Sequence, residues 1–425
     1  MLCINDSVRI TQNINSKKYC GEYIVYNSKT GNKLKIDYSC YLLIKEINEN
    51  NIENNKELLN ISKKYCNNYN DIINMLVDHN IIDSTNNFKN NNILQPLEIK
   101  FPLTSLTLEI TTNCNLKCKH CYGQFGDNTS SLNLSLDNIK SLKPALDKLH
   151  TRNIALTGGE VFVHKEFEEI VHYFLSNGFV LTIFTNGYNY ERFRKFLDRF
   201  SNYHFSVKIS LDGLEKTHNN VRGKEDAFAN ALKSLQLLSK YKNVNSAIST
   251  VVMKDNLYEI NEFKKMTEVK FPRFNHHYDL VYPTQNDNQQ KTSFSINEFD
   301  TLYKEYPFLF EIKEQNEKSK YRCAGGITTA ALGVNKILRM CAAANGDCFV
   351  LGDLNQNDLY YIWTKPNQNC MKFRKEKPHS SKKCKKCNIK SKCNINDCRL
   401  LAKEYTSDMD NPNPLACFMV KKYCV

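Results

Sequence analysis

The sequence lacks any long apolar run: in its 425 residues, no stretch approaches the roughly 18 apolar residues that a membrane span needs. The start, MLCINDSVRI, also lacks the form of a signal peptide, because Asp6 stands where the apolar segment would lie. A secreted or membrane-inserted protein is therefore not expected, and we predict a cytoplasmic one. At roughly 150 residues per domain the length predicts about three domains. A content of 41% hydrophobic and 24% charged residues suits a globular protein with a real core.

Cysteine is absent from residues 122–322, although the chain has 17 cysteines. Three of them lie within residues 114–121, and ten follow residue 322. A cytosolic compartment keeps thiols reduced and disulfides rare, so this clustering indicates metal ligation. The net charge of +13 is enough to attract an anionic partner, but it does not identify one.

The first 83 residues predict a small α/β unit. Two alternating β-rich runs meet at a Lys-Thr-Gly-Asn turn within residues 19–38, which is typical of a β-hairpin. The polar stretch STNNFKNNN offers almost nothing to bury, so we predict a linker over residues 84–100. Helical patterns lie between the hairpin and the linker, at residues 39–48, 55–68 and 71–82.

Residues 101–300 alternate β-rich runs with amphipathic helical patterns, which predicts βαβ units and a parallel sheet, as an open barrel or a doubly wound sheet. Residues 315–425 are poor in large apolar residues and rich in Cys, Lys and Asn. This part therefore needs additional stabilisation to fold, and its cysteines are the candidates for it. The six expected strands are SLTLEI, NIALTG, FVLTIFT, HFSVKIS, SAISTVV and FNHHYDLVY.

Cys114, Cys118 and Cys121 follow the first of these strands, with spacings of three and then two residues. Three thiols so spaced can cover one face of an iron–sulfur cube and leave the fourth iron without a protein ligand. A structural zinc site is closed by four ligands and usually begins with a CxxC pair. His120 could complete a zinc site, but it lies between two of the cysteines, where it cannot easily point the same way.

The segment CNLKCKHCY resembles the CxxxCxxC signature of radical S-adenosylmethionine (SAM) enzymes, and the resemblance extends over most of residues 101–282. It implies a partial (β/α)6 TIM-like barrel. It also implies that an electron from a [4Fe–4S] cluster splits SAM into methionine and a 5′-deoxyadenosyl radical, which abstracts a substrate hydrogen. The catalytic cluster would be held by Cys114, Cys118 and Cys121.

Further short motifs end the next three strands, where α/β folds bind ligands. Thr157-Gly-Gly-Glu160 resembles the GGE motif, whose backbone meets the SAM amino group and whose carboxylate can receive an ammonium. The segment from Ser210 to Gly213 resembles the ribose-contacting segment, and Arg222 is placed to reach the SAM carboxylate. The resemblance thus implies these SAM-binding residues: Tyr122, Gly158, Gly159, Glu160, Thr185, Asn186, Ser210, Asp212 and Arg222.

The cysteines after residue 322 form a second field. Read alone, the CxxC pair and two later cysteines favour a treble-cleft or zinc-ribbon site, and the lysines beside them hint at nucleic acid. We interpret that lysine run as a solvated, charge-balancing face. Behind a radical SAM core, the field resembles the SPASM domain, which holds two auxiliary [4Fe–4S] clusters. The resemblance assigns Cys384, Cys387, Cys393 and Cys417 to the outer cluster and Cys323, Cys341 and Cys398 to the inner one.

Two departures loosen the SPASM geometry: four residues separate Cys393 from Cys398 where three are usual, and Lys336 replaces an expected glycine. The inner cluster has only three well-placed cysteines, so one iron is open to a substrate thiolate unless Cys348 closes the site. The remaining cysteines are interpreted as small core residues: Cys3, Cys20, Cys40, Cys66, Cys370 and Cys424.

The hairpin and helices of residues 1–83 resemble the winged-helix module with which ribosomal peptide maturases bind a leader peptide as an added strand. A DNA-binding winged helix is the alternative. We therefore predict a radical SAM/SPASM maturase of a precursor peptide, of the sactipeptide or ranthipeptide type, that forms thioether cross-links. Alternatives are C–C cross-linking or epimerisation, sulfatase maturation to formylglycine, and a zinc-stapled nucleic-acid-binding protein.

The expected cofactors are SAM and three [4Fe–4S] clusters, one radical SAM and two auxiliary. The expected partners are a precursor peptide with a leader sequence and an electron donor such as flavodoxin or ferredoxin. No nucleic acid or membrane partner is expected.

Overall fold

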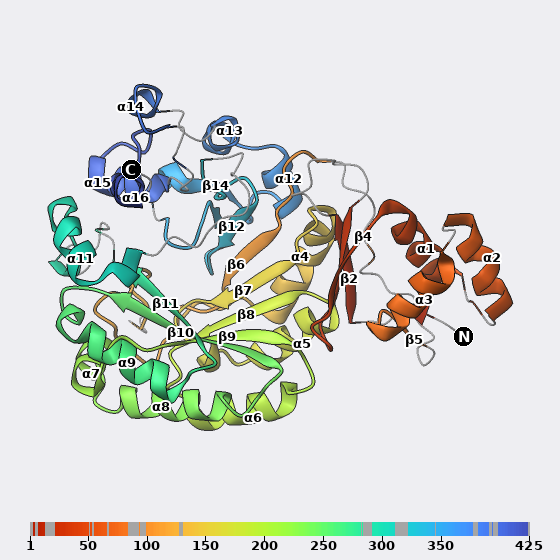
Figure 1. The fold of residues 1–425 in the computed structure, drawn as a ribbon, viewed down its shortest axis with the longest axis horizontal. Coiled ribbons are helices and arrows are strands. Elements are labelled where there is room, and N and C mark those ends of the chain that lie inside the picture. Colours follow the sequence, from red (N-terminus) through yellow and green to blue (C-terminus); the bar gives the residue numbers. More distant parts are fainter. Residues whose placement is uncertain are drawn as a thin grey trace.

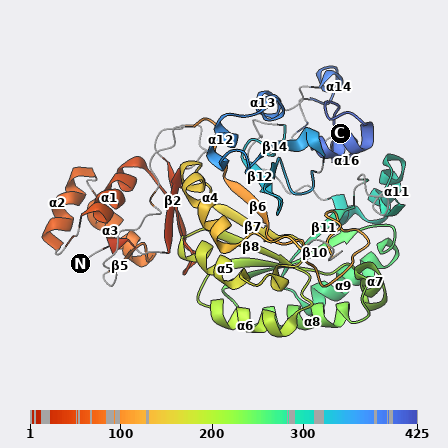
Figure 2. The ribbon, with the colours of Figure 1, turned by 180° about the vertical axis from the view of Figure 1, so that it is seen from behind.

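The computed structural model places three parts side by side: an N-terminal unit, a large curved sheet with helices on its outer side, and a C-terminal region (Figures 1 and 2). Two separate apolar cores hold the N-terminal unit and the rest of the chain. Cys20, Cys66 and Cys424 lie outside the described residues. The structure describes residues 3–4, 7–12, 22–50, 52, 55–65, 68–83, 93, 99–126, 131–281, 283, 291–310, 322–344, 346–376, 381–390, 393 and 398–423.

Six parallel strands form the centre of the molecule and neighbour one another in chain order, which confirms the predicted partial barrel. Strictly alternating burial, as in β9, shows why these segments are strands: one face packs on helices and the other lines the interior. Their carboxyl ends meet at one edge of the sheet, where ligands bind in such folds. The strands are β6 (Ser105–Glu109), β7 (Asn153–Thr157), β8 (Val180–Thr185), β9 (Phe205–Ser210), β10 (Val244–Val252) and β11 (Asn275–Leu280).

Amphipathic helices connect these strands and cover the outer side of the sheet (Figure 1). Their apolar residues face the core; α6, for example, buries four aromatic or aliphatic side chains and exposes its charged ones. The helices are α4 (Leu136–Lys148), α5 (Phe167–Ser176), α6 (Tyr190–Phe200), α7 (Glu215–Arg222), α8 (Ala227–Leu238) and α9 (Ile260–Lys270). Helix α11 (Phe299–Glu305) follows β11 along the chain.

The C-terminal region continues the central sheet. Strand β12 (Thr329–Leu332) pairs parallel with β6, and β13 (Ile337–Arg339) and β14 (Val350–Asp353) extend the sheet antiparallel. The sheet therefore has nine described strands and crosses the predicted boundary between core and cysteine-rich part. Short helices that the sequence pattern did not reveal complete this region: α12 (Leu359–Thr364), α13 (Gln368–Lys375), α14 (Lys382–Lys385), α15 (Arg399–Thr406) and α16 (Pro414–Tyr423).

The N-terminal unit contains the predicted hairpin, formed by β3 (Tyr23–Asn27) and β4 (Lys33–Ile36). A further strand, β2 (Val8–Gln12), pairs with β3, so the three-stranded sheet has the order β2-β3-β4. Strand β4 is thus an edge strand among the described residues. The predicted helices are present as α1 (Tyr38–Glu49), α2 (Asn55–Tyr65) and α3 (Tyr69–Asp78), and β1 (Cys3–Ile4) pairs with β5 (Ile82–Asp83).

Strand β2 fixes the N-terminal unit to the barrel. The fully buried Arg9 donates to the carbonyl of Thr151 at 3.0 Å and forms an ion pair of 2.8 Å with Asp147. Its guanidinium also lies 3.9 Å from the centre of the Phe179 ring. Ser28 adds a hydrogen bond from its hydroxyl to the carbonyl of Leu175 at 2.6 Å. The two parts are therefore joined by buried polar contacts rather than by the linker alone.

Candidate metal and cofactor site

The three predicted ligands Cys114, Cys118 and Cys121 lie in the loop that follows β6, and all three are partly buried. Strand β7 holds this loop from its carboxyl end: the amides of Gly159 and Glu160 donate to the carbonyls of Thr111 and Asn113, each at 2.8 Å. The loop is thus positioned by the neighbouring strand end before any cofactor binds.

Gly158 and Gly159 are required by this contact between strand end and loop. A Cβ at Gly159 would lie 2.1 Å from the carbonyl oxygen of Asn113. Gly158 has φ +134°, and a Cβ there would lie 2.4 Å from the carbonyl oxygen of Thr111. The close approach that the glycines allow is therefore to the cysteine loop itself. Their contact with the SAM amino group stays a prediction.

Glu160 joins the ends of β7 and β8. Its buried carboxylate accepts hydrogen bonds from Thr185 Oγ1 and from the amide of Asn186, both at 2.7 Å, and from the amide of Phe162 at 3.0 Å. Burial raises the pKa of Glu160, although these bonds oppose the rise. The side chain thus positions Thr185 and Asn186, and a direct contact with an ammonium stays a prediction.

Asn115 is a site residue that the motifs did not single out. Asn186 donates to its side-chain oxygen at 2.8 Å, which connects the end of β8 to the residue after Cys114. The only signal in the sequence is its place between two predicted ligands. Glu160, Asn186 and Asn115 therefore form one chain of polar contacts from the sheet to the cysteine loop.

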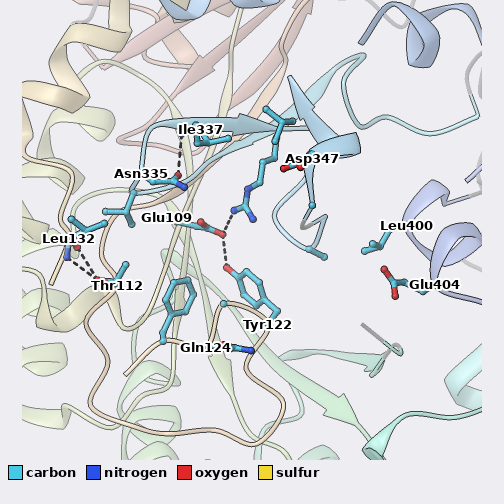
Figure 3. Close-up of a pocket in the computed structure, with 17 residues that line it drawn as sticks. Glu109, Thr112, Tyr122, Gln124, Leu132, Asn335, Ile337, Asp347, Leu400 and Glu404 are labelled. Carbon is cyan, nitrogen blue, oxygen red and sulfur yellow. Dashed lines mark hydrogen bonds and ion pairs between the residues drawn. The ribbon is translucent and has the colours of Figure 1, made fainter. Parts of the chain in front are cut away.

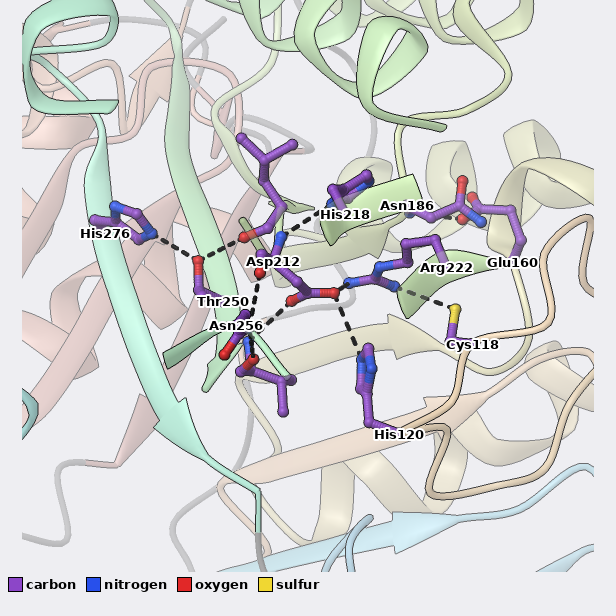
Figure 4. A network of polar contacts seen from close by, with 12 residues as sticks. Cys118, His120, Glu160, Asn186, Asp212, His218, Arg222, Thr250, Asn256 and His276 are labelled. Atoms are coloured by element: carbon purple, nitrogen blue, oxygen red, sulfur yellow. Dashed lines mark hydrogen bonds and ion pairs between the residues drawn. The ribbon is translucent and has the colours of Figure 1, made fainter. Parts of the chain in front are cut away.

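Asp212 and Arg222 are brought together beneath the same loop (Figure 4). Their carboxylate and guanidinium form a buried ion pair of 2.7 Å, and Arg222 also donates to Cys118 Sγ at 3.5 Å. Burial alone would raise the pKa of Asp212, but the neighbouring Arg222 cation is the largest opposing effect, and the pKa is held below its usual value. The predicted residue Ser210 ends β9, in register with Ser249 of β10.

Two histidines pack around this ion pair as neutral groups. His120 Nε2 lies 3.7 Å from Asp212 Oδ2, and burial lowers the pKa of His120 to about 4. Burial lowers the pKa of His218 to about 3, and its Nδ1 accepts a hydrogen bond from the amide of Asp212 at 3.0 Å. His120 therefore turns to Asp212 (Figure 4), which weakens the zinc alternative in which it joins the three thiols.

The donor set fits a SAM-bound iron–sulfur cluster. Arg222 Nε is buried and has no hydrogen-bond partner among the described residues, so this guanidinium keeps a donor for an anionic ligand. Within the described part of the chain, no three His, Cys, Asp or Glu side chains gather as they would around one metal ion. In a cube each thiolate binds a different iron, so the three thiols need not converge on one point.

Tyr122 points to the other side of the loop, into a cavity of about 890 Å³ (Figure 3). Its hydroxyl donates to Glu109 Oε1 at 3.1 Å, and Arg339 of β13 pairs with the same oxygen at 2.6 Å. Sequence reasoning missed Glu109 and Arg339, which lie 230 positions apart and meet only because β12 joins β6. The cavity lies between the cysteine loop and the C-terminal region.

Three of the predicted auxiliary ligands, Cys323, Cys341 and Cys398, lie close enough to affect the pKa values of one another's thiols. Burial, with smaller contributions from the neighbouring Cys323 and Cys341, raises the pKa of Cys398 to about 12. Burial likewise raises the pKa of Cys341 to about 11, with Cys323 as the next contribution. Such thiols stay protonated without a metal, so loading a cluster would release their protons.

Cys348 has a different partner: Lys403 of α15 donates to its sulfur at 3.2 Å. The outer set is less fully described. Cys384 and Cys387 are joined by a turn hydrogen bond of 3.2 Å, and Cys417 lies in α16. Two cysteines interpreted as core residues, Cys40 and Cys370, are buried as expected.

The sheet topology and the cysteine loop together define a radical SAM enzyme. Residues 108–267 match the model of the Radical SAM superfamily. The protein is therefore a radical SAM enzyme with SAM and one [4Fe–4S] cluster as cofactors. No helix in the described part of the chain is long and apolar enough to cross a membrane.

Two curated relatives extend beyond this domain. The chain is 25% identical over 339 residues to the antilisterial bacteriocin subtilosin biosynthesis protein AlbA of Bacillus subtilis, covering 76% of this chain and 73% of that protein. It is 26% identical over 348 residues to an AdoMet-dependent heme synthase of Methanosarcina barkeri, covering 73% of this chain and 95% of that protein.

One solved structure shares the fold over nearly the whole chain. Streptococcus suis SuiB bound to precursor peptide SuiA superposes with a TM-score of 0.65 and 16% identity, covering 98% of this chain and all (100%) of that one. The shared fold therefore includes the N-terminal unit and the C-terminal region.

Proposed function

We propose that the protein is a maturase of a ribosomally synthesised precursor peptide and forms thioether bonds from a peptide Cys sulfur to a carbon. The observation that carries this proposal is the N-terminal unit with its edge strand. The fold of SuiB, which was solved with its precursor peptide, includes this unit. Similarity to a bacteriocin biosynthesis protein agrees with a peptide substrate.

Strand β4 has the geometry to receive a leader peptide as a further strand. Asn27 and Asn32 form a hydrogen-bonded pair at the hairpin turn. In an antiparallel ladder such pairs alternate, so the backbone groups of Leu34 and Ile36 face β3. The backbone N–H and C=O groups of Lys33 and Lys35 then face the open edge. Their side chains are exposed, which favours a leader with acidic residues.

The cavity beside Tyr122 would take the segment of the peptide that is modified. Its volume of about 890 Å³ is in the range of sites that hold several side chains. Residues of the cysteine loop line one side, and residues near Cys341 and Cys348 line the other. A peptide in this cavity would reach both the radical site and the inner auxiliary thiols.

The C-terminal thiols are proposed to hold two auxiliary [4Fe–4S] clusters. Cys323, Cys341 and Cys398 would bind the inner cluster, and Cys384, Cys387, Cys393 and Cys417 the outer one. The bond between Lys403 and Cys348 favours an inner cluster with only three protein ligands. Its fourth iron would then be free to bind the substrate Cys sulfur. We expect the protein to work in the cytoplasm with a reducing partner.

The leader-binding step is tested at β4, because deleting the N-terminal unit would expose the barrel surface against which Arg9 packs. Lys35→Pro removes one outward N–H and leaves the bonds to β3 in place, since edge strands tolerate proline. Lys35→Ala keeps the N–H and is the matched control. Loss of one pairing bond is worth about 1 kcal/mol, roughly a fivefold weaker affinity or more.

The measurement is calorimetric titration with the leader of a cognate precursor. Both substitutions remove the Lys35 charge, so weaker binding in Lys35→Pro than in Lys35→Ala supports strand addition at β4. Equal affinity of the Lys35→Pro variant and the wild type would contradict it.

A further inference from the structure

Five lysines surround the first two proposed ligands of the outer cluster and form an exposed cationic surface. We call them the α14 lysines, and all five side chains are exposed. None of them forms an ion pair with an acidic side chain in the described part of the chain. The α14 lysines are Lys382, Lys383, Lys385, Lys386 and Lys390.

Other cations of the C-terminal region are used within the fold, which sets the α14 lysines apart. The buried Arg399 and Arg322 both pair with Glu376, at 2.8 and 3.5 Å. Lys372 pairs with Asp410 at 2.7 Å. Internal charge balance therefore explains these residues but leaves the α14 lysines without a partner in the described structure.

The α14 lysines flank Cys387, the most exposed of the proposed cluster ligands in the described part of the chain. Cys387 is exposed, whereas Cys323, Cys341 and Cys398 are only partly so. Beside α14 lies an open cavity of about 800 Å³, which is lined by five cationic and three acidic residues, Lys382 and Lys385 among the cations. An outer cluster at this place would lie close to the surface, beneath a positive and hollowed face.

We propose that the α14 lysines are the docking surface for an acidic one-electron carrier protein that reduces the outer cluster. This inference rests on the proposed outer cluster. In the step, the carrier loses one electron and the cluster gains it, and no bond forms or breaks. Lysines around an exposed redox centre attract an acidic partner at long range and orient it toward that centre.

Two other anionic partners fit this surface less well. Nucleic-acid surfaces usually interleave aromatic side chains for stacking, and residues 382–390 contain none. The leader peptide is assigned to β4, which lies in the N-terminal unit, away from α14 (Figure 1). A carrier at α14 and a leader at β4 can therefore bind at the same time.

The test reverses the charge of three α14 lysines and leaves every cysteine unchanged, in Lys382→Glu, Lys386→Glu and Lys390→Glu combined. The matched control is Lys195→Glu, Lys233→Glu and Lys240→Glu combined. These three lysines are also exposed and unpaired among the described residues, but they lie on α6 and α8 and just after α8. Iron content is measured in both variants, so that a lost cluster is recognised.

The first readout is the affinity for an acidic bacterial flavodoxin, measured by calorimetry at low and at high salt with cluster-free and loaded protein. We expect the α14 variant to bind about tenfold or more weakly at low salt and to lose the salt dependence, because exposed charges act through screened attraction. The control variant should bind like the wild type.

The second readout is the rate at which reduced flavodoxin bleaches the clusters in stopped flow, compared with the small reductant dithionite. The α14 variant should be slow only with flavodoxin. Equal flavodoxin affinity in both variants would overturn the docking surface, as would preferential binding of a leader peptide or single-stranded DNA there. Absence of auxiliary iron in the wild type would instead contradict the proposed clusters, while carrier binding by the cluster-free protein stays measurable.

Discussion

At the scale of residues, the site depends on a few buried polar side chains that position the cysteine loop. Asp212 holds Arg222, and Arg222 reaches Cys118. Glu160 holds Asn186, and Asn186 reaches Asn115. Both chains of contacts start at strand ends and finish at the loop. A rigid loop of this kind presents thiols to a cofactor without a large loss of conformational entropy.

Asp212→Asn should destabilise the fold, because it leaves the buried Arg222 cation without its anion. We expect the free energy of unfolding to fall by about 3 kcal/mol, the lower range for breaking a buried pair. Urea denaturation of the cluster-free protein measures this. Asp137→Asn changes a carboxylate whose side chain is 94% exposed and should alter stability by less than about 0.5 kcal/mol. Equal effects of the two substitutions would contradict the role of the pair.

Cys348→Ala should keep the iron content of the wild type, because Lys403 rather than a cluster is the partner of that thiol in the structure. Cys341→Ala, in contrast, should lose the iron of the inner cluster. Iron and sulfide analysis of the reconstituted variants compares them. A Cys348→Ala protein that loses as much iron as Cys341→Ala would show that Cys348 closes the cluster.

At the scale of elements, β2 connects the N-terminal unit, which has its own apolar core, to the barrel. Its residue Arg9 is buried against Asp147 of α4, Thr151 after that helix and Phe179 after α5, although more than a hundred residues separate Arg9 from these partners. The ion pair with Asp147 therefore fixes where β3 and β4 lie relative to the barrel. The edge that we assign to the leader is thereby held at a constant distance from the cavity.

Arg9→Met should loosen this attachment, since it removes a buried charge pair and the contact with Phe179 while keeping an apolar side chain. Hydrogen bonds to charged groups are worth about 2 kcal/mol. Hydrogen exchange of β2 should therefore become roughly thirtyfold faster if it opens locally. Arg194→Met removes a half-exposed surface pair and should leave exchange nearly unchanged. Unchanged exchange in Arg9→Met would show that the linker, and not β2, joins the two parts.

The parallel strands and the helices between them could be predicted from the sequence, because each has a regular apolar pattern of its own. Strand β2 could not be, since its buried Arg9 looks like a surface residue until its partner Asp147 is known. The same holds for Glu109 and Arg339, which a strand pairing across 230 positions brings together. Helix α15 was missed because eight residues contain too few turns for a clear period.

The cysteine loop was predictable because three cysteines at two short spacings indicate its chemistry, whereas the residues that support it are distributed over several strand ends. Thus Gly159, Glu160 and Asn186 were named for a ligand, and the structure adds that they also hold the loop. Local motifs identify which groups meet a cofactor. They do not show that the same groups also form hydrogen bonds that hold the cysteine loop in place.

At the scale of the whole molecule, three sites lie along one body. The leader edge β4 lies where the N-terminal unit meets the barrel, the radical site and the cavity of about 890 Å³ are in the middle, and α14 lies in the C-terminal region, away from β4 (Figure 1). The central sheet runs from β11 through β6 into β14 and so connects the radical site with the C-terminal thiols. This arrangement suits an enzyme that binds a peptide on one side of the radical site and receives electrons on another.

The most direct test of peptide maturation follows one hydrogen atom. The reconstituted protein is incubated with SAM, dithionite and a Cys-containing precursor that is deuterated at its carbon positions. A thioether-forming maturase should place deuterium in 5′-deoxyadenosine, remove two hydrogen atoms from the peptide per bond and leave the bonded Cys without a free thiol for alkylation. A C–C cross-link would leave that thiol free, and epimerisation would not lower the peptide mass beyond label exchange. Unlabelled 5′-deoxyadenosine together with an unchanged peptide would contradict peptide maturation itself.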